Sequence, residues 1–375
     1  MNQKELLFSV LRAGICGEQT ENAQDTEETL AELFSLAVKH DLAHIAGQVL
    51  GKRKGAEKFA QAAMGAVQRY LMQNAAFGAV CAVLEGAKIP FLPLKGSVLR
   101  HFYPDPWLRT SCDIDLLVQE ENLESAAAAL EQRGWRRGEK HSHDLSLYSP
   151  TGVHLELHFT VMEDSRMPAA QGVLSRFWQD AKPAQEGCCL LKSSDEMFYF
   201  YHMAHMAKHL EGGGCGVRSF LDVWVLNHRM KFDKAARNAL LEEGGLLSFA
   251  KAAEHLAEVW FSRGEHTAVT RALEQFVLEG GIYGNLENRV AYRSTKKGSE
   301  NYVRSRIFMR TDSLKEQYPV LREHRWLAPF CQVHRWGKIV VSGRLRRGVK
   351  ELQAKKTASA ETVDSVQTLL EHLGI

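Results

Sequence analysis

The stretch IPFLPLKGSVLRHFYPDPWLRTSCDIDLLV, residues 89–118, decides how this chain folds. Its first apolar run, 89–94, ends in a Lys-Gly-Ser turn, and its second, DIDLLV, opens with two carboxylates. Successive side chains of a strand point to opposite faces, so Asp113 and Asp115 share one face while the apolar residues beside them point into a core. Two prolines in the first run favour a strand that lies at the edge of a sheet or is irregularly paired. The stretch therefore predicts two strands joined through a polar turn.

The residues that follow predict the rest of a small mixed sheet. A helical pattern covers about residues 120–134, and three β-like segments follow at 134–138, 143–150 and 153–161, separated by Ser, Pro and Gly turn residues. Together with the two strands described above, these segments predict an α/β unit over about residues 88–162.

Long helical patterns lie on both sides of this unit. Apolar residues recur at helical spacing through residues 2–87 and again from about 190, where a glycine-rich break at 211–216 separates two helices. We therefore expect an α+β protein whose small mixed-sheet core is flanked by helical regions. The expected parts are a helical N-terminal region at 1–87, an α/β core at 88–188, and a mostly helical C-terminal region at 189–375.

The composition is that of an ordinary globular protein. The chain has 375 residues, 45% of them hydrophobic and 25% charged, and a formal net charge of only +2. This balance excludes a whole-chain electrostatic attraction to nucleic acid or membrane. Seven scattered cysteines without a C-x-x-C pair fit free thiols in a reducing compartment. No apolar run reaches the roughly 20 residues of a membrane span, so we expect a soluble cytoplasmic protein.

The carboxylates of the second strand predict a metal site. Two carboxylates side by side repel each other unless a cation lies between them, and Mg²⁺ or Mn²⁺ is the natural candidate. A third carboxylate, Glu156, lies in VHLELHF, where His154, Glu156 and His158 alternate with apolar residues. If this strand lies beside DIDLLV, then Asp113, Asp115 and Glu156 form a two-metal site.

The Lys-Gly-Ser turn predicts a phosphate-binding site. Gly96 at a strand-to-helix turn lets backbone N–H groups approach an anion closely, and Ser97 adds a hydroxyl. Lys95 and Arg109 are cations that can neutralise a triphosphate. Each of these motifs is common on its own, but their combination in this order is more specific.

The set of motifs resembles a known superfamily. A Gly-Ser turn, an acid-x-acid strand and a third acid on a later strand are similar to the pattern of polymerase-β-type nucleotidyltransferases. More closely, LKG, then YPD and an arginine ahead of DIDLLV, then ELHF, resemble a bacterial family of uncharacterised nucleotidyltransferases. The helix HMAHMAKHL and the segment VRSFLDVWVL also look like this family, so the resemblance extends over about residues 30–345.

The resemblance implies a catalytic α/β core, Mg²⁺ dependence, and transfer of a nucleotidyl group from a nucleoside triphosphate such as ATP. The acids it implies are Asp113, Asp115 and Glu156, and the turn is Gly96-Ser97. Behind the site it suggests supporting roles for residues of the later helices, namely His202, His205, His209, Arg218 and Asp222. The spacing from the turn to the acids is longer than in compact superfamily members, so we expect YPDPWLRTSC to loop out.

Three functions follow from these patterns. The first is attack by an acceptor hydroxyl on the α-phosphorus of an NTP with release of pyrophosphate, the acceptor being a protein, a small molecule, a sugar or an RNA end. The second is a metal-dependent hydrolase. Its metal would be held by Asp222 and by His202, His205 and His209, which share a helical face, unless these histidines only pack against the core. The third is a catalytically inactive nucleotide-binding regulatory module.

Two further features leave alternatives open. Arg218 and Asp222 are four residues apart on one helix, which indicates an ion pair or a brace for the site. The region 304–353 carries basic residues near Trp326 and Trp336, which indicates either a nucleic-acid surface or a solvated helical face. The basic residues are Arg335, Lys338, Arg344, Arg346 and Arg347.

Overall fold

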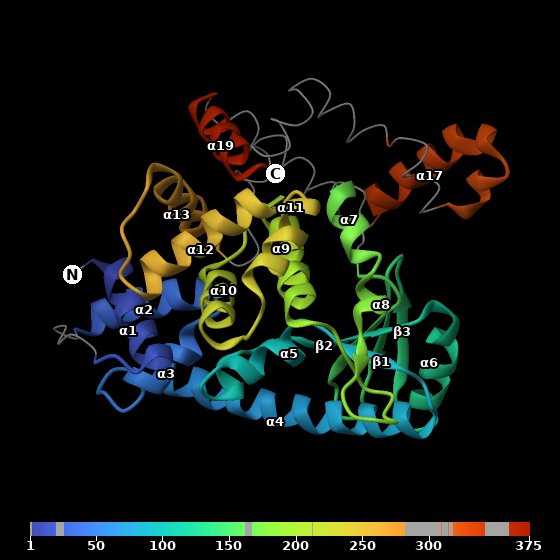
Figure 1. Cartoon of the computed structure of the whole chain (residues 1–375), viewed down its shortest axis with the longest axis horizontal. Coiled ribbons are helices and arrows are strands. Elements are labelled where there is room, and N and C mark those ends of the chain that lie inside the picture. Colours follow the sequence, from blue (N-terminus) through green and yellow to red (C-terminus); the bar gives the residue numbers. More distant parts are fainter. Residues whose placement is uncertain are drawn as a thin grey trace.

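A computed structural model of the chain describes residues 2–19, 26–161, 167–211, 213–281, 309, 314, 318–341 and 360–375. The chain begins with four helices, α1 (Gln3–Cys16), α2 (Glu27–Lys39), α3 (Ala43–Leu50) and α4 (Glu57–Gly86). The fourth is 30 residues long and runs from beneath the N-terminal helices to beneath the sheet (Figure 1). This long helix therefore supports both parts of the molecule.

A five-stranded mixed sheet follows α4. Its strands are β1 (Phe91–Pro93), β2 (Asp113–Val118), β3 (Arg136–Lys140), β4 (Asp144–Tyr148) and β5 (His154–His158), in the spatial order β1-β2-β5-β4-β3. Strands β2 and β5 are parallel, and the other neighbours are antiparallel. The proline-containing β1 lies at the edge, as the sequence predicts. A small ribbon of β6 (Lys182–Pro183) and β7 (Leu191–Lys192) adjoins it.

One face of the sheet is apolar and the other carries the polar residues. The alternating apolar residues of β2, β4 and β5 pack against α4 and against α6 (Leu123–Glu131) in one buried cluster. Val80 and Leu84 of α4 and Leu130 of α6 are completely buried in this cluster. The acidic residues of β2 and β5 consequently point away from α4 and α6.

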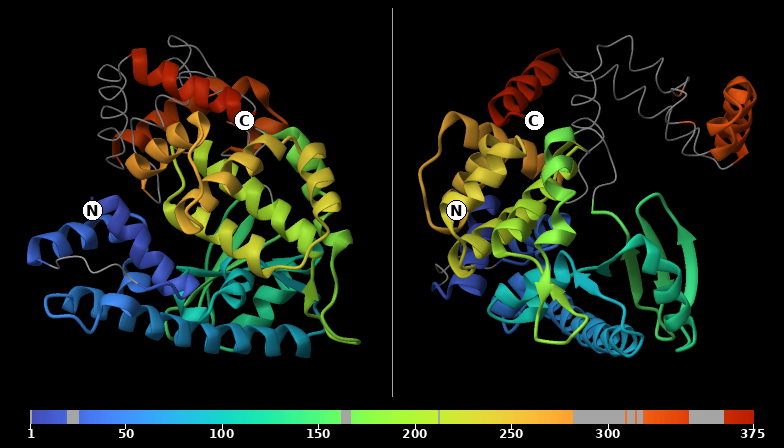
Figure 2. Two further views of the ribbon diagram at one scale, coloured as in Figure 1. Left: turned by 60° about the vertical axis from the view of Figure 1, so that its left-hand side comes forward. Right: turned by 45° about the vertical axis from the view of Figure 1, so that its right-hand side comes forward.

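Most of the later helices join the N-terminal helices in one buried cluster, and those nearest the sheet line its polar side. They are α7 (Pro168–Leu174), α8 (Phe177–Asp180), α9 (Asp195–Glu211), α10 (Val217–Arg229), α11 (Lys234–Glu243), α12 (Leu247–Phe261), α13 (Ala268–Gly280) and α19 (Ala360–Leu373). A further helix, α17 (Ala328–Val341), packs in a separate small cluster. Phe8 of α1 stacks on Trp260 of α12, with ring centroids 4.8 Å apart. Figure 2 shows α1 beside α12 and α13, so helices from both ends of the chain share one hydrophobic core.

The expected fold class is confirmed, because a small mixed sheet is flanked by helices that precede and follow it in sequence. The expected boundaries at residues 87/88 and 188/189 stay predictions. All seven cysteines are unpaired. Within the described parts of the chain, every helix is too short or too polar to cross a bilayer.

Candidate active site

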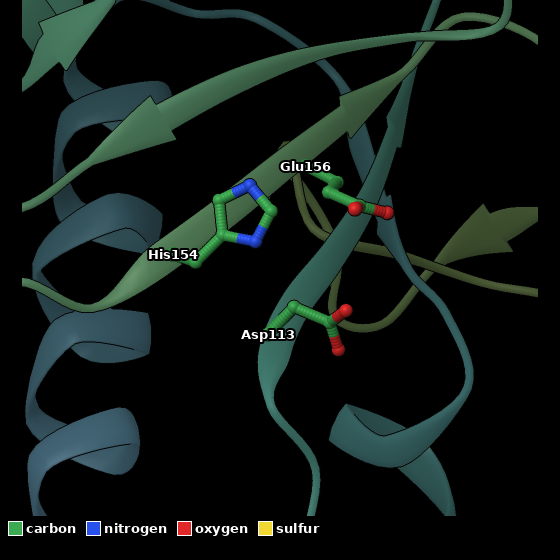
Figure 3. Close-up of side chains that lie close together, drawn as sticks. All are labelled: Asp113, His154 and Glu156. Carbon is green, nitrogen blue, oxygen red and sulfur yellow. The ribbon is translucent and has the colours of Figure 1, made fainter. Parts of the chain in front are cut away.

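The parallel pairing of β2 with β5 brings the predicted acids together. Asp113 lies opposite His154, and Asp115 lies opposite Glu156. The possible ligand atoms of Asp113, His154 and Glu156 lie within 4.8 Å of one another, and the same holds for Asp115, Glu156 and His158. Figure 3 shows Asp113, His154 and Glu156 gathered beside the two strands. The sheet register therefore produces one cluster of acids and histidines.

Asp115 is the buried member of this cluster, with 2% of its surface exposed. Its Oδ1 lies 2.8 Å from Lys95 Nζ and 2.9 Å from His158 Nε2. Burial acts to raise the pKa of Asp115, but Lys95 and His158 outweigh burial and hold that pKa below its ordinary value. Burial likewise acts to lower the pKa of His158, whereas its hydrogen bonds to Asp115 and Glu156 raise it to about 9. Asp115 is therefore a carboxylate already neutralised by two cations.

Asp113 differs because it has no cation of its own. It is half-buried, and no ion pair joins it to another side chain in the part of the chain that the structure describes. Burial, followed by repulsion from Asp115 and Glu156, raises the pKa of Asp113 to about 6. A hydrogen bond from His158 lowers the pKa of Glu156. The open side of the cluster thus holds negative charge that a bound cation would neutralise.

The Lys-Gly-Ser turn lies beside these acids in a strained conformation. Lys95 has a φ of 43°, a region that residues other than glycine rarely adopt. A Cβ on Gly96 would lie 3.0 Å from the Cβ of Ser111, so the close approach of the two segments requires glycine. The Ser97 hydroxyl is buried and has no hydrogen-bond partner among the described residues. Ser97 Oγ is therefore an enclosed hydroxyl whose hydrogen bond is not supplied by the described residues.

A buried polar network, which sequence reasoning missed, fixes the turn against the start of β2. Arg100 donates from Nε to the Gly96 carbonyl at 2.9 Å, and from Nη2 to Gln73 Oε1 at 3.1 Å and Ser111 Oγ at 3.0 Å. The Ser111 hydroxyl donates to the Asp113 carbonyl at 2.9 Å. One residue of the sequence could have indicated this network. Gln73 is polar, but it lies on the same face of α4 as the buried residues Phe59 and Val80.

The segment 103–112 does not loop out, contrary to the expectation from its length. Tyr103, Arg109 and Thr110 are buried. The Tyr103 hydroxyl and Arg109 Nε each donate to Oδ1 of Asp222 in α10 at 2.7 Å. The insert therefore ties the sheet to the helices, and Arg109 is engaged in this buried ion pair rather than directed toward a phosphate.

The expected ion pair between Arg218 and Asp222 is also replaced by other partners. Arg218 pairs with Asp41 at the end of α2, and Thr110 Oγ1 donates to the same carboxylate at 3.0 Å. Asp222 pairs with Arg109 instead. The two helical residues thus hold the insert from two sides, which fits the expected bracing role.

The histidines of α9 do not form a three-ligand metal site of their own. Among the described residues, the groups of three possible ligands occur at the acids of the sheet. His202 is buried near Asp222, and burial lowers the pKa of its ring. His205 Nε2 lies 2.9 Å from His209 Nε2. His205 also lines a small pocket beside the acids together with Lys95, His158, Tyr201 and Lys208. The helix therefore lines this pocket with one cation, Lys208, and with a histidine whose pKa burial lowers, His205.

The basic C-terminal region is only partly described. Arg335 and Lys338 lie on α17, and Trp326 and Phe330 near its start are largely exposed. The other predicted basic residues, Arg344, Arg346 and Arg347, lie outside the described residues. The nucleic-acid surface stays a prediction.

The profile of the uncharacterised nucleotidyltransferase family matches residues 26–262, which is well over half of the chain. The chain belongs to this family. The matched region includes the sheet, the insert and the helices from α2 to α12. Membership supports nucleotidyl transfer as the general class of reaction. No curated protein and no solved structure matches the chain.

Proposed function

We propose that this protein is a divalent-metal-dependent nucleotidyltransferase that transfers a nucleoside monophosphate from an NTP to an acceptor hydroxyl and releases pyrophosphate. The observation that carries the proposal is the meeting of Asp113, Asp115 and Glu156 on two adjacent parallel strands in a member of a nucleotidyltransferase family. The Gly96-Ser97 turn ahead of these acids supports a polymerase-β-type site.

The donor set fits a divalent cation. Asp113 and Glu156 are partly exposed carboxylates, and Asp113 has no ion-pair partner among the described residues. Hard oxygen ligands of this kind suit Mg²⁺ or Mn²⁺. Asp115 lies directly beside them on the same face. These three residues would hold the metal, which when bound would neutralise phosphate charge and activate the acceptor oxygen.

The basic pocket beside the acids supports a position for the triphosphate. Lys95, His158 and Lys208 line it, and the hydroxyl of Ser97 lies in the adjoining turn. Positive charge at this place favours the β- and γ-phosphates, and stabilises the pyrophosphate that leaves. Lys95 and Ser97 therefore keep their proposed phosphate contacts, whereas Arg109 acts by holding the insert in place.

In the proposed reaction the acceptor oxygen forms a bond to the α-phosphorus while the bond from that phosphorus to the pyrophosphate oxygen breaks. Glu156, which is partly exposed, receives the proton of the acceptor hydroxyl. Lys95 and its neighbours keep the leaving pyrophosphate charge neutralised. The register of the two strands would place the acids to orient the α-phosphate for this displacement.

The test is the double variant Asp113→Asn/Asp115→Asn, with Asp105→Asn, an exposed carboxylate of the insert, as the matched control. Transfer of label from each α-labelled NTP to a host lysate, together with pyrophosphate release, measures activity and locates the acceptor. We expect activity in the wild type and the control, and none in the double variant. Full activity in the double variant would remove the acids from the mechanism, and a wild type that binds NTP without turnover would indicate the regulatory module.

A further inference from the structure

We propose that His154 is a nitrogen ligand of the cation held by Asp113 and Glu156, and that this ligand makes the site prefer Mn²⁺ to Mg²⁺. The inference rests on the proposed function, because it concerns the metal of that same site. It adds a residue and a metal preference that a three-carboxylate pattern does not contain.

The position of His154 in the sheet is the first argument. His154 is paired with Asp113 across the β2–β5 ladder and is two residues before Glu156, so all three side chains emerge on one face. Their possible ligand atoms lie within 4.8 Å of one another. Figure 3 shows the imidazole beside the two carboxylates. All three residues are partly exposed, which leaves a route for a cation from solvent.

The surroundings of the ring are the second argument. His154 Nε2 lies 3.1 Å from Ser146 Oγ on β4, and the ring stacks on Tyr148 with centroids 4.9 Å apart and planes 16° apart. A histidine that ligates a metal commonly donates its other N–H to a neighbouring oxygen, which fixes the tautomer and the ring orientation. When Nε2–H donates to Ser146, the lone pair of Nδ1 is left for a cation.

His158 provides an internal contrast. Its Nε2 is hydrogen-bonded to Asp115 and lies 3.3 Å from Glu156, and only 5% of its side chain is exposed. Its Nε2 is therefore already occupied in neutralising carboxylates. Of the two histidines on β5, His154 is the one that stands at the open, unneutralised side of the cluster.

The metal preference follows from the ligand type. Mg²⁺ strongly favours oxygen ligands and retained water. Mn²⁺ shares this affinity for carboxylates, but it belongs to the first-row series of ions that also bind sites of mixed nitrogen and oxygen ligands. Two carboxylates and one imidazole therefore favour Mn²⁺ more than a set of carboxylates alone. Replacement of the imidazole by an amide should remove this advantage while leaving the oxygen ligands for Mg²⁺.

The experiment uses the full-length protein with Mn²⁺ alone, so that no step depends on turnover. Pulsed electron paramagnetic resonance detects the coupling of Mn²⁺ to a directly bound nitrogen nucleus. We expect this coupling in the wild type and in the control His141→Gln, an exposed histidine before β4, and its loss in His154→Gln. A titration should show that His154→Gln lowers Mn²⁺ affinity about 10-fold or more, with Mg²⁺ affinity, measured by competition, nearly unchanged.

A second variant keeps the test decisive if His154→Gln does not fold. Ser146→Ala leaves the imidazole in place but removes its hydrogen-bond partner, and should weaken Mn²⁺ binding about 10-fold. Bound Mn²⁺ without nitrogen coupling, or coupling that persists in His154→Gln, would overturn the role of His154 and leave the proposed function standing. A wild type that binds neither Mn²⁺ nor Mg²⁺ would overturn both.

Discussion

Two clusters of charged residues among the described residues differ in their charge balance. At the acid face of the sheet, three carboxylates meet two cationic side chains, Lys95 and His158. Between the insert and the helices, the carboxylates Asp41 and Asp222 meet the guanidinium groups of Arg218 and Arg109. The first cluster retains an excess of negative charge, whereas the second is neutral. Both remove charges from water, but only the first leaves a place for a ligand cation.

The difference separates a cluster with a structural role from the cluster that we propose to bind a metal. A neutral cluster is satisfied by its own members, so its energetic role is to fix the relative position of the segments that carry it. An unbalanced cluster raises the pKa of one of its members, as it does for Asp113, and is relieved by binding. Substitutions in one cluster at a time, with both stability and activity measured, test whether the neutral and the unbalanced cluster differ in role.

The largest effect is expected on stability from Asp222→Ala in the neutral cluster. The substitution leaves Arg109 with its side chain 9% exposed and without its carboxylate partner. Removal of one partner of a buried pair costs about 3–5 kcal/mol of unfolding free energy. Denaturant unfolding measures the loss. The double variant Arg109→Met/Asp222→Leu should recover much of the stability, and a single variant as stable as the wild type would refute the structural role.

The next effect is on activity, from Asp115→Asn in the unbalanced cluster. We expect nucleotidyl transfer to fall by about 10²-fold or more, because a metal ligand contributes several kcal/mol to the transition state. The loss of stability should be smaller than in Asp222→Ala, since Lys95 keeps 24% of its side chain exposed to water. Label transfer and thermal unfolding, measured on the same preparation, check both parts. If Asp115→Asn destabilised the protein as much as Asp222→Ala does, the two clusters would not differ in their structural role.

The unbalanced cluster was predictable from sequence, whereas the neutral one was not. The period of two in DIDLLV and VHLELHF places Asp115 and Glu156 on one face, and burial of the intervening apolar residues fixes the strand register. The partner of Arg109 lies 113 residues away, and that of Arg218 lies 177 residues away. The spacing of four residues suggested an ion pair between Arg218 and Asp222. In the folded chain Asp222 pairs with Arg109 of the insert instead, and Arg218 pairs with Asp41.

The contacts that hold the Lys-Gly-Ser turn in place were likewise not predictable from local sequence patterns. Gln73 and Arg100 are in contact because α4 passes beneath the start of β2. The periodicity of apolar residues in the sequence does not predict where a helix crosses a strand. The strained backbone of Lys95 likewise depends on contacts that hold the turn from both sides. Sequence patterns therefore identified the residues that carry charge in the site, while the tertiary structure determines what holds them there.

A smaller effect is expected from Gly96→Ala, which alters the approach of the turn to the acids. Its Cβ would meet the Cβ of Ser111 at 3.0 Å, so the turn must shift away from β2. We expect a stability loss of about 1–3 kcal/mol, typical of overpacking, and a weaker binding of NTP. The control Gly65→Ala adds a methyl to an open position of α4. Denaturant unfolding and NTP titration measure the effects, and a variant that matches this control would show that the close approach is unimportant.

The smallest effect is a pH dependence caused by His40, which lies beside the neutral cluster. His40 is fully buried next to Asp41, and its Nδ1 accepts a hydrogen bond from the backbone of Val217. Burial, with a smaller contribution from Lys39, lowers the pKa of His40 to about 4. Because this folded-state pKa lies below the unfolded value of about 6.5, full stability is present above pH ~6.5 and is lost progressively as the pH falls toward 4.

Protonation of His40 would place a positive charge in a fully buried position. Between pH ~7 and pH ~5 we expect this residue to account for about 1–2 kcal/mol of lost stability. Unfolding of wild type and His40→Gln, measured across this range, isolates the contribution, and His141→Gln controls for an exposed ring. Equal pH slopes in wild type and His40→Gln would mean that burial does not lower the pKa of His40, because a group with the same pKa in the folded and unfolded states contributes nothing to the pH dependence of stability.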